Sequence, residues 1–147
     1  MGHRPIILNA DDNLVHIRLL QHVFGNSDSD FRIQVVRDGK QVVDYLSRNP
    51  ATDLFDEYPT PDLLLLDLDM PNLDGFQVLQ WIRAEPKYKE LPVVILSASS
   101  DREDMRKAYA LGANGYLVKP FSKRDYEGLV EQVRRFLLEM KDAPPRQ

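Results

Sequence analysis

Short apolar runs alternate with amphipathic helical patterns five times along this chain, and this alternation restricts the fold more than any other feature. The strand-like runs are Ile6-Ile7-Leu8, Phe31 to Val35, Leu63 to Leu66, Val93 to Leu96, and Tyr116-Leu117-Val118. Each is followed by a stretch in which apolar residues recur at helical spacing. Strict alternation of strands and helices predicts an α/β fold, with a parallel sheet covered by helices on both faces.

The strand patterns also indicate the order of the strands. An unbroken apolar run is typical of a strand covered on both faces, whereas an edge strand alternates apolar and polar residues. The first, third and fourth runs are unbroken, the second alternates, and the fifth is too short to classify. We therefore predict a doubly wound, flavodoxin-like (βα)5 domain with the order 2-1-3-4-5 over residues 5–138. Residues 1–4 and 139–147 are expected to be short extensions, with no output domain.

Local signals predict where the last two helices begin and where the fourth ends. Ser100-x-x-Glu103 has the pattern of a capping box at the start of the fourth helix, and Gly112 is expected to close that helix. Ser122-x-x-Asp125 is expected to cap the last helix in the same way.

Composition excludes several classes of function. The 147 residues include no cysteine, which excludes a disulfide framework and thiolate metal sites. The net charge of −4 argues against a general nucleic-acid binder. No apolar run approaches the roughly 18 residues that a membrane span requires. We therefore expect a cytoplasmic protein with no nucleic-acid and no membrane partner.

Carboxylates follow the first and third strand-like runs, as Asp11-Asp12 and as Asp67-Leu68-Asp69. In the order 2-1-3-4-5 the chain reverses direction between these two strands, and ligands bind at the carboxyl ends of the strands at that point. Gathered carboxylates repel one another, a cost that a hard cation removes, and oxygen ligands with open water positions suit Mg²⁺. The sequence therefore predicts a Mg²⁺ site. For Asp12, an N-cap of the first helix is the alternative.

Two more polar strand ends are expected at the same edge of the sheet. Ser97 ends the fourth run and is followed by the small residues Ala98 and Ser99, and Lys119-Pro120 follows the fifth run. A hydroxyl and an ammonium beside a metal-bound carboxylate are the groups that a phosphoryl group needs around its oxygens. For Lys119, an ordinary surface lysine is the alternative.

Taken together, these motifs resemble the receiver domain of two-component response regulators, of the stand-alone type, over nearly the whole chain. The motifs are Asp11-Asp12, Asp67 within DLDMPNLDG, Ser97-Ala98 and Lys119-Pro120. The resemblance implies that Asp67 is the phosphate acceptor. It also implies that Asp11, Asp12, Asp67 and the backbone carbonyl of Asp69 bind Mg²⁺.

The resemblance assigns roles to the last two strand ends as well. Ser97 and Lys119 are expected to bind the phosphoryl oxygens, and the Lys119–Pro120 peptide bond is expected to be cis. Tyr116 matches the switch aromatic of the family, which swings inward as the Ser97 hydroxyl moves toward the phosphate. An edge-strand tyrosine without such motion is the alternative.

The implied function is a phosphorylation-dependent signalling switch, not an enzyme. Its expected partners are a sensor histidine kinase or histidine phosphotransfer protein upstream and a protein target downstream, and a homodimer is allowed. The long connection 49–61 resembles that of a subset of single-domain receivers, including some paired with phytochrome-type kinases. It is interpreted either as a partner contact or as a packed surface loop.

Two other functions remain open at this point. Asp67-x-Asp69 after an apolar strand also resembles haloacid-dehalogenase-type phosphatases, in which the first Asp is the nucleophile and the second the general acid. That family places its nucleophile after the first strand, whereas here an acidic pair comes first. The other alternative is a receiver-like interaction module that no longer accepts phosphate, against which the complete residue set argues.

Three further polar residues are interpreted as structural. Asn9 lies late in the first strand, where we expect an amide with satisfied hydrogen bonds. His16 and His22 lie on the first helix without metal-ligand partners, and we expect them at the surface or its boundary.

Overall fold

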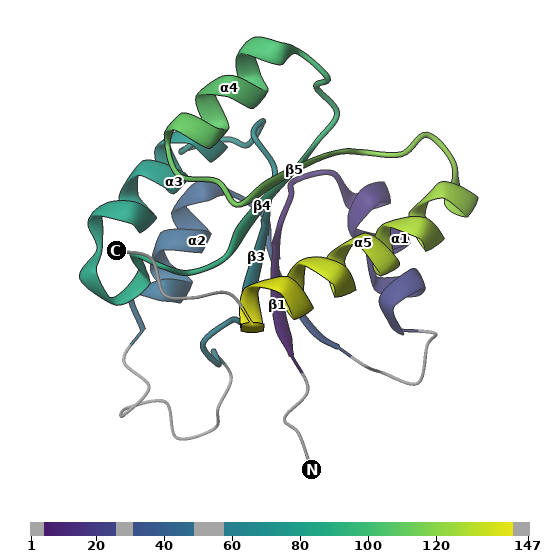
Figure 1. Cartoon of the computed structure of the whole chain (residues 1–147), viewed down its shortest axis with the longest axis horizontal. Helices are drawn as coiled ribbons and strands as arrows, with labels where there is room; N and C mark the ends of the chain where they lie inside the picture. Colours follow the sequence, from purple (N-terminus) through teal and green to yellow (C-terminus); the bar gives the residue numbers. More distant parts are fainter. Residues whose placement is uncertain (1–4, 26–30, 49–57, 143–147) are drawn as a thin grey trace.

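A computed structural model describes residues 5–25, 31–48 and 58–142, and it contains a five-stranded parallel sheet between two layers of helices (Figure 1). The strands are β1 (Ile6–Ala10), β2 (Arg32–Val36), β3 (Leu63–Leu66), β4 (Val93–Ser97) and β5 (Gly115–Val118). Their order is β2-β1-β3-β4-β5, and every neighbouring pair is parallel. The predicted fold class and strand order are therefore confirmed. Residues 49–57 of the long connection lie outside the described residues.

The described α-helices alternate with the strands, and one short 3-10 helix follows the third α-helix. The helices are α1 (Leu14–Gly25), α2 (Gly39–Leu46), α3 (Gly75–Ala84), the short 3-10 helix η1 (Pro86–Tyr88), α4 (Arg102–Ala110) and α5 (Lys123–Asp142). Helices α1 and α5 cover one face of the sheet, and α2, α3 and α4 cover the other (Figure 1). None of these helices is long and apolar enough to cross a membrane. Helix α5 continues to Asp142, past the expected boundary at residue 138.

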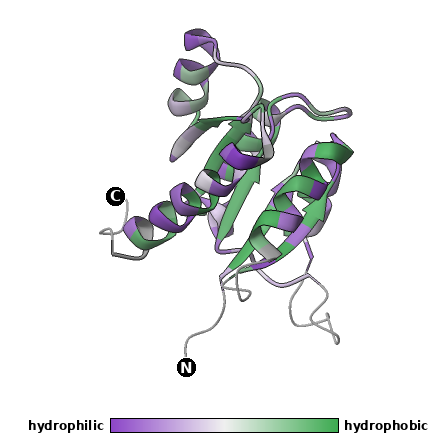
Figure 2. Ribbon diagram, turned by 90° about the vertical axis from the view of Figure 1, so that its right-hand side faces the viewer, coloured by the Kyte–Doolittle hydropathy of each residue, from purple (hydrophilic) through white to green (hydrophobic). Residues whose placement is uncertain are grey.

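Burial explains why the strand patterns predicted the sheet order. Strands β1, β3 and β4 are buried at every position, whereas the edge strands β2 and β5 are mostly half-buried. Because successive side chains of a strand point to opposite faces, each inner strand contributes to both cores. In β3, Leu64 and Leu66 join the core under α2 and α3, and Leu63 and Leu65 join the core under α1 and α5. Figure 2 shows the apolar residues gathered in the sheet between helices with polar outer faces.

Helix α1 is capped by Asn13 and not by Asp12. The Asn13 side-chain oxygen accepts the backbone N–H groups of Val15 at 3.0 Å and His16 at 3.3 Å. An Asn at this position satisfies donors that would otherwise have no partner in the first turn. The Asp12 carboxylate is therefore not used as a helix cap.

The signals around α4 and α5 are confirmed in two cases and wrong in one. Gly112 closes α4 with φ 106°, a left-handed conformation that favours glycine. The Ser122 hydroxyl accepts a backbone N–H from the first turn of α5. The predicted Ser100–Glu103 capping box is wrong: Asp101 is still extended, and its own carboxylate accepts the Glu103 N–H at 2.9 Å. The cap therefore lies one residue later than predicted.

Candidate functional site

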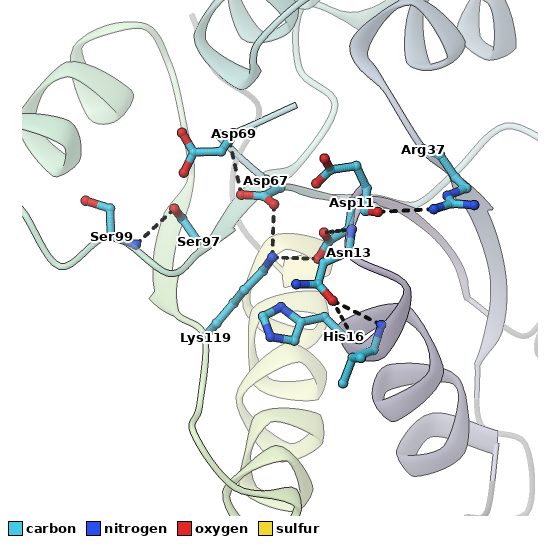
Figure 3. Close-up of polar contacts among 11 residues, drawn as sticks. Asp11, Asn13, His16, Arg37, Asp67, Asp69, Ser97, Ser99 and Lys119 are labelled. Atoms are coloured by element: carbon cyan, nitrogen blue, oxygen red, sulfur yellow. Dashed lines mark hydrogen bonds and ion pairs between the residues drawn. The ribbon is translucent and has the colours of Figure 1, made fainter. Parts of the chain in front are cut away.

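The four predicted motifs lie together at the carboxyl edge of the sheet (Figure 3). Asp11 follows β1, Asp67 follows β3, Ser97 ends β4 and Lys119 follows β5. The strand ladder continues past the strand ends and holds these backbones in place. The Asp67 N–H donates to the Ala10 carbonyl at 3.0 Å, and the Lys119 N–H donates to the Ser97 carbonyl at 2.7 Å.

Three carboxylates form a cluster with the geometry of a cation site. Asp11, Asp12 and Asp67 each offer an oxygen, and these atoms lie within 4.8 Å of one another. Asp11 and Asp67 are buried, whereas Asp12 is exposed. Two fixed oxygens and one open to solvent suit a hard cation that keeps part of its water shell. Asp12 is free for this role because Asn13 caps the helix.

Lys119 is buried among these carboxylates and is not a surface lysine. Its ammonium nitrogen lies 2.7 Å from Asp11 Oδ2 and 2.9 Å from Asp67 Oδ2, and the residue is 6% exposed. Burial lowers the pKa of Lys119, but its hydrogen bonds to Asp11 and Asp67 outweigh burial, so the net pKa lies above its ordinary value. The side chain therefore stays protonated and offers a fixed positive charge beside Asp67.

The Asp67 carboxylate is held at both oxygens and carries a perturbed pKa. Oδ2 accepts from Lys119, and Oδ1 accepts the Asp69 backbone N–H at 3.2 Å. Burial raises the pKa of Asp67 from 3.8 to about 6, and the nearby Asp11 charge adds to this effect, against the opposing influence of Lys119. One ammonium thus does not compensate three carboxylates, and the remaining negative charge favours a cation.

Ser97 and Tyr116 connect this pocket to α4. Ser97 is fully buried, and its hydroxyl oxygen accepts the Ser99 N–H at 3.2 Å. The Tyr116 hydroxyl donates to the Ser99 carbonyl at 2.8 Å, and the Ser99 hydroxyl donates to Asp104 at 2.6 Å. The loop after β4 is therefore tied to β5 on one side and to α4 on the other.

Two expectations for individual residues are wrong. All peptide bonds of the described residues are trans, including the bond between Lys119 and Pro120. The trans form is the intrinsically preferred one even before proline, and Lys119 reaches both carboxylates from it. Asn9 is 2% exposed, and its side-chain nitrogen has no hydrogen-bond partner among the described residues, so its amide is not fully satisfied.

The two histidines lie where the sequence predicted them. His16 is half-buried on α1, with its ring centroid 6.1 Å from that of Tyr126 on α5, and His22 is exposed. Arg37, in contrast, was not anticipated. Its guanidinium donates to the Asp12 carbonyl at 3.2 Å, and nothing in the sequence distinguishes it from other exposed arginines after an edge strand.

A Gly75→Ala substitution is expected to displace the acceptor loop. A Cβ at this first residue of α3 would lie 2.4 Å from the Asp67 carbonyl oxygen and 2.7 Å from Leu68 Cα, both backbone atoms that have little room to shift. We expect the free energy of unfolding to fall by about 3 kcal/mol. Urea denaturation of the purified variant measures this.

Gly128→Ala is the matched control, because Gly128 lies in α5 and a Cβ there meets nothing within 4 Å. This variant is expected to be more stable than the wild type by about 1 kcal/mol, the difference in helix propensity. Equal effects of the two substitutions would contradict the close approach at Gly75.

Comparison with known proteins agrees with this geometry. The family model described as response regulator receiver domain matches residues 7–131. The chain is 34% identical over 139 residues to the regulatory protein FilR2 of Methanothrix harundinacea, covering 95% of this chain and 87% of that protein. It is 33% identical over 139 residues to the response regulator Rcp1 of Synechocystis, covering 95% and 92% of the two chains.

Solved structures give the same result. The phosphorylated cyanobacterial phytochrome response regulator RcpA superposes with a TM-score of 0.83 at 32% identity, covering 97% of this chain and 100% of that one. The Mn²⁺-bound form of Rcp1 superposes with a TM-score of 0.79 at 33% identity, covering 96% and 99%. Both structures match this chain over nearly its whole length.

Proposed function

Because this chain belongs to the response regulator receiver family, we propose that it is a phosphorylation-dependent switch whose acceptor is Asp67. The family consists of signalling modules and not of enzymes, so the phosphatase alternative is dropped. One observation carries the choice of Asp67. Its carboxylate follows the central strand β3, between Asp11 after β1 and Ser97 at the end of β4, and it contacts Lys119 at 2.9 Å.

We propose Mg²⁺ as the cation of this site. Asp11, Asp12 and Asp67 supply carboxylate oxygens, and the backbone carbonyl of Asp69 is the fourth protein ligand in the proposal. The raised pKa of Asp67 supports a bound cation, and the relative Rcp1 binds Mn²⁺, which prefers oxygen ligands as Mg²⁺ does. When bound, such an ion neutralises charge on the transferring phosphoryl group.

The transfer itself is an in-line displacement. An Asp67 oxygen forms a bond to phosphorus as the bond between phosphorus and the donor's leaving group breaks, and the leaving group takes the electron pair. The Lys119 ammonium and the Ser97 hydroxyl are proposed to donate to the phosphoryl oxygens. Ser97 ends β4 and Lys119 follows β5, so both side chains lie at the same edge of the sheet as Asp67.

The switch is proposed to act through the loop after β4. The phosphoryl group adds one to two negative charges and three acceptor oxygens beside Asp67. A shift of Ser97 toward these oxygens would strain the Tyr116–Ser99 and Ser99–Asp104 hydrogen bonds. Helix α4 would then move with the loop, and the Tyr116 side chain would swing inward.

A histidine kinase is the upstream partner that a receiver domain implies. Which kinase serves this chain is a proposal: the similarity to RcpA, a phytochrome response regulator, favours a phytochrome-type kinase as the first candidate. A downstream protein that binds the α4 side of the phosphorylated form completes the proposed pathway.

Acetyl phosphate labelling tests the proposed function. Incubation of the wild type with acetyl phosphate and Mg²⁺ is expected to add the mass of one phosphoryl group, mapped by peptide mass spectrometry to Asp67. Chelation of the metal by EDTA is expected to prevent labelling. No labelling by acetyl phosphate or by any kinase of the same genome would favour the phosphate-independent interaction module instead.

A further inference from the structure

Four buried side-chain polar atoms have no hydrogen-bond partner among the described residues. One of them, Asp11 Oδ2, is in ion-pair contact with Lys119 at 2.7 Å. The other three are the Asn9 side-chain nitrogen, His16 Nδ1 and the Tyr126 hydroxyl. Asn9 and Tyr126 are 2% and 1% exposed. Native proteins pair nearly all buried polar atoms with protein groups or with ordered water, because an unpaired one destabilises the fold.

These three atoms lie in the layer on the face of the sheet that α1 and α5 cover. Asn9 pairs in register with Leu65, so both side chains project from the same face of the sheet. Leu65 belongs to the same core as Tyr126. The rings of His16 and Tyr126 lie with their centroids 6.1 Å apart. Three elements therefore contribute one polar atom each to a common region of an otherwise apolar layer.

This region adjoins the charged pocket. Figure 3 shows the His16 imidazole beside the Lys119 side chain. Burial and the Lys119 charge lower the pKa of His16, and burial with the charges of Asp11 and Asp67 raises the pKa of Tyr126 to about 12. The charges of the pocket therefore act on both side chains, and both pKa shifts favour the neutral forms of His16 and Tyr126.

Lys119 itself has an unused donor. A protonated lysine offers three N–H groups. Asp67 Oδ2 accepts one of them at 2.9 Å, Asp11 Oδ2 lies in ion-pair contact at 2.7 Å, and the described residues offer no third acceptor. Two donors therefore need an acceptor, the third N–H of Lys119 and the side-chain N–H of Asn9. The acceptor nitrogen of a neutral His16 needs a donor. The Tyr126 hydroxyl can donate or accept a hydrogen bond.

We propose that Asn9, His16 and Tyr126 bind a buried water molecule beneath Lys119, and that this water accepts the third Lys119 N–H. The occupant must donate and accept hydrogen bonds, which excludes an apolar molecule. Lys119 repels a cation, and the carboxylates beyond it repel an anion. A buried water with two to four polar partners meets these requirements. Asn9, His16 and Tyr126 are then positioning residues for Lys119, a role that rests on the proposed function.

Tyr126→Phe tests the water site, because it removes only the hydroxyl. If the hydroxyl is hydrogen-bonded to water, the folding equilibrium constant falls about threefold to tenfold. Tyr88→Phe is the matched control, since the buried Tyr88 hydroxyl donates to the Leu46 carbonyl at 2.8 Å on the other side of the sheet. Urea denaturation should show losses of similar size. A Tyr126→Phe variant that is as stable as the wild type, or more stable, would overturn the water site.

Labelling by acetyl phosphate tests the positioning role, at a temperature where all variants are folded. Loss of the water frees Lys119 beside Asp67, and the labelling rate of Tyr126→Phe is expected to fall about tenfold, as for other groups that orient a site from outside. Tyr88→Phe should be labelled at the wild-type rate. A wild-type rate in Tyr126→Phe overturns the positioning role. A wild type that is not labelled overturns the proposed function instead, and the stability comparison still decides the water site.

Discussion

Asp67→Asn is expected to abolish labelling by acetyl phosphate. The amide keeps the size of the side chain but is a far weaker nucleophile than the carboxylate. Mass spectrometry after incubation with acetyl phosphate and Mg²⁺ measures the loss.

Asp69→Asn is the matched control for this variant. It lies two residues further along the same loop, its side chain is exposed, and its contact with Asp67 uses the backbone N–H. This variant is expected to be labelled. Labelling of Asp67→Asn at the wild-type level would contradict the assignment of the acceptor, and loss of labelling in Asp69→Asn would point to a role for that carboxylate.

The same Asp67→Asn variant is expected to be more stable than the wild type when no metal is present. The folded-state pKa of Asp67, about 6, lies above its ordinary value of 3.8. A group with a raised pKa stabilises the fold while protonated, so its contribution is complete below pH 3.8 and is lost as the pH rises through about 6. At pH 7 the variant should exceed the wild type by about 2 kcal/mol, and below pH 4 the two should be nearly equal.

Urea denaturation of both proteins in EDTA, at several pH values, measures this difference. Added Mg²⁺ should reduce it or reverse it, because a ligand that binds the folded state stabilises the wild type more. A metal-free wild type that is more stable than Asp67→Asn at pH 7 would contradict the electrostatic account of the cluster.

Arg83→Met is expected to produce a large loss of stability far from the acceptor. The Arg83 guanidinium, on α3, donates to a ring of acceptors that belong to η1, to the turn before β4 and to the turn after α4. These acceptors are the backbone carbonyls of Gly112, Tyr88, Lys89 and Leu91 and the side-chain oxygen of Asn114. Removal of the guanidinium leaves several of them unpaired, and the free energy of unfolding should fall by about 3 kcal/mol.

Arg106→Met is the control for this substitution. Arg106 pairs with Glu103 across one turn of α4, with both side chains mostly exposed, and such pairs contribute less than about 1 kcal/mol. Arg83→Lys keeps the charge but not the planar fork, and it should fall between the wild type and Arg83→Met. Equal urea midpoints for the Arg83→Met and Arg106→Met variants would show that the hydrogen bonds from Arg83 to these acceptors do not stabilise the fold.

Much of the candidate site was predictable because parallel strands end at one edge of their sheet. The apolar runs located the strands. The residues directly after them could therefore be predicted to be neighbours without any knowledge of side-chain geometry. The confirmed neighbours are Asp11 and Asp67 with Lys119, joined at 2.7 and 2.9 Å. Helix caps were less predictable, since Ser100 and Asp101 are both good capping residues and the sequence does not decide between adjacent candidates.

The sequence by itself determined the fold class, the strand order and the identity of the polar residues at the strand ends, because periodicity and position along the chain carry that information. Only the tertiary structure decided what depends on distance and burial. Lys119 is a buried counter-ion because β5 packs beside β4, which the residue type alone does not reveal. Asn9 and His16 were interpreted as separate structural residues, and the sequence analysis did not single out Tyr126; the packing of α1 against α5 brings the rings of His16 and Tyr126 to 6.1 Å between their centroids. Contacts between residues this far apart in the chain leave no periodic signal in it.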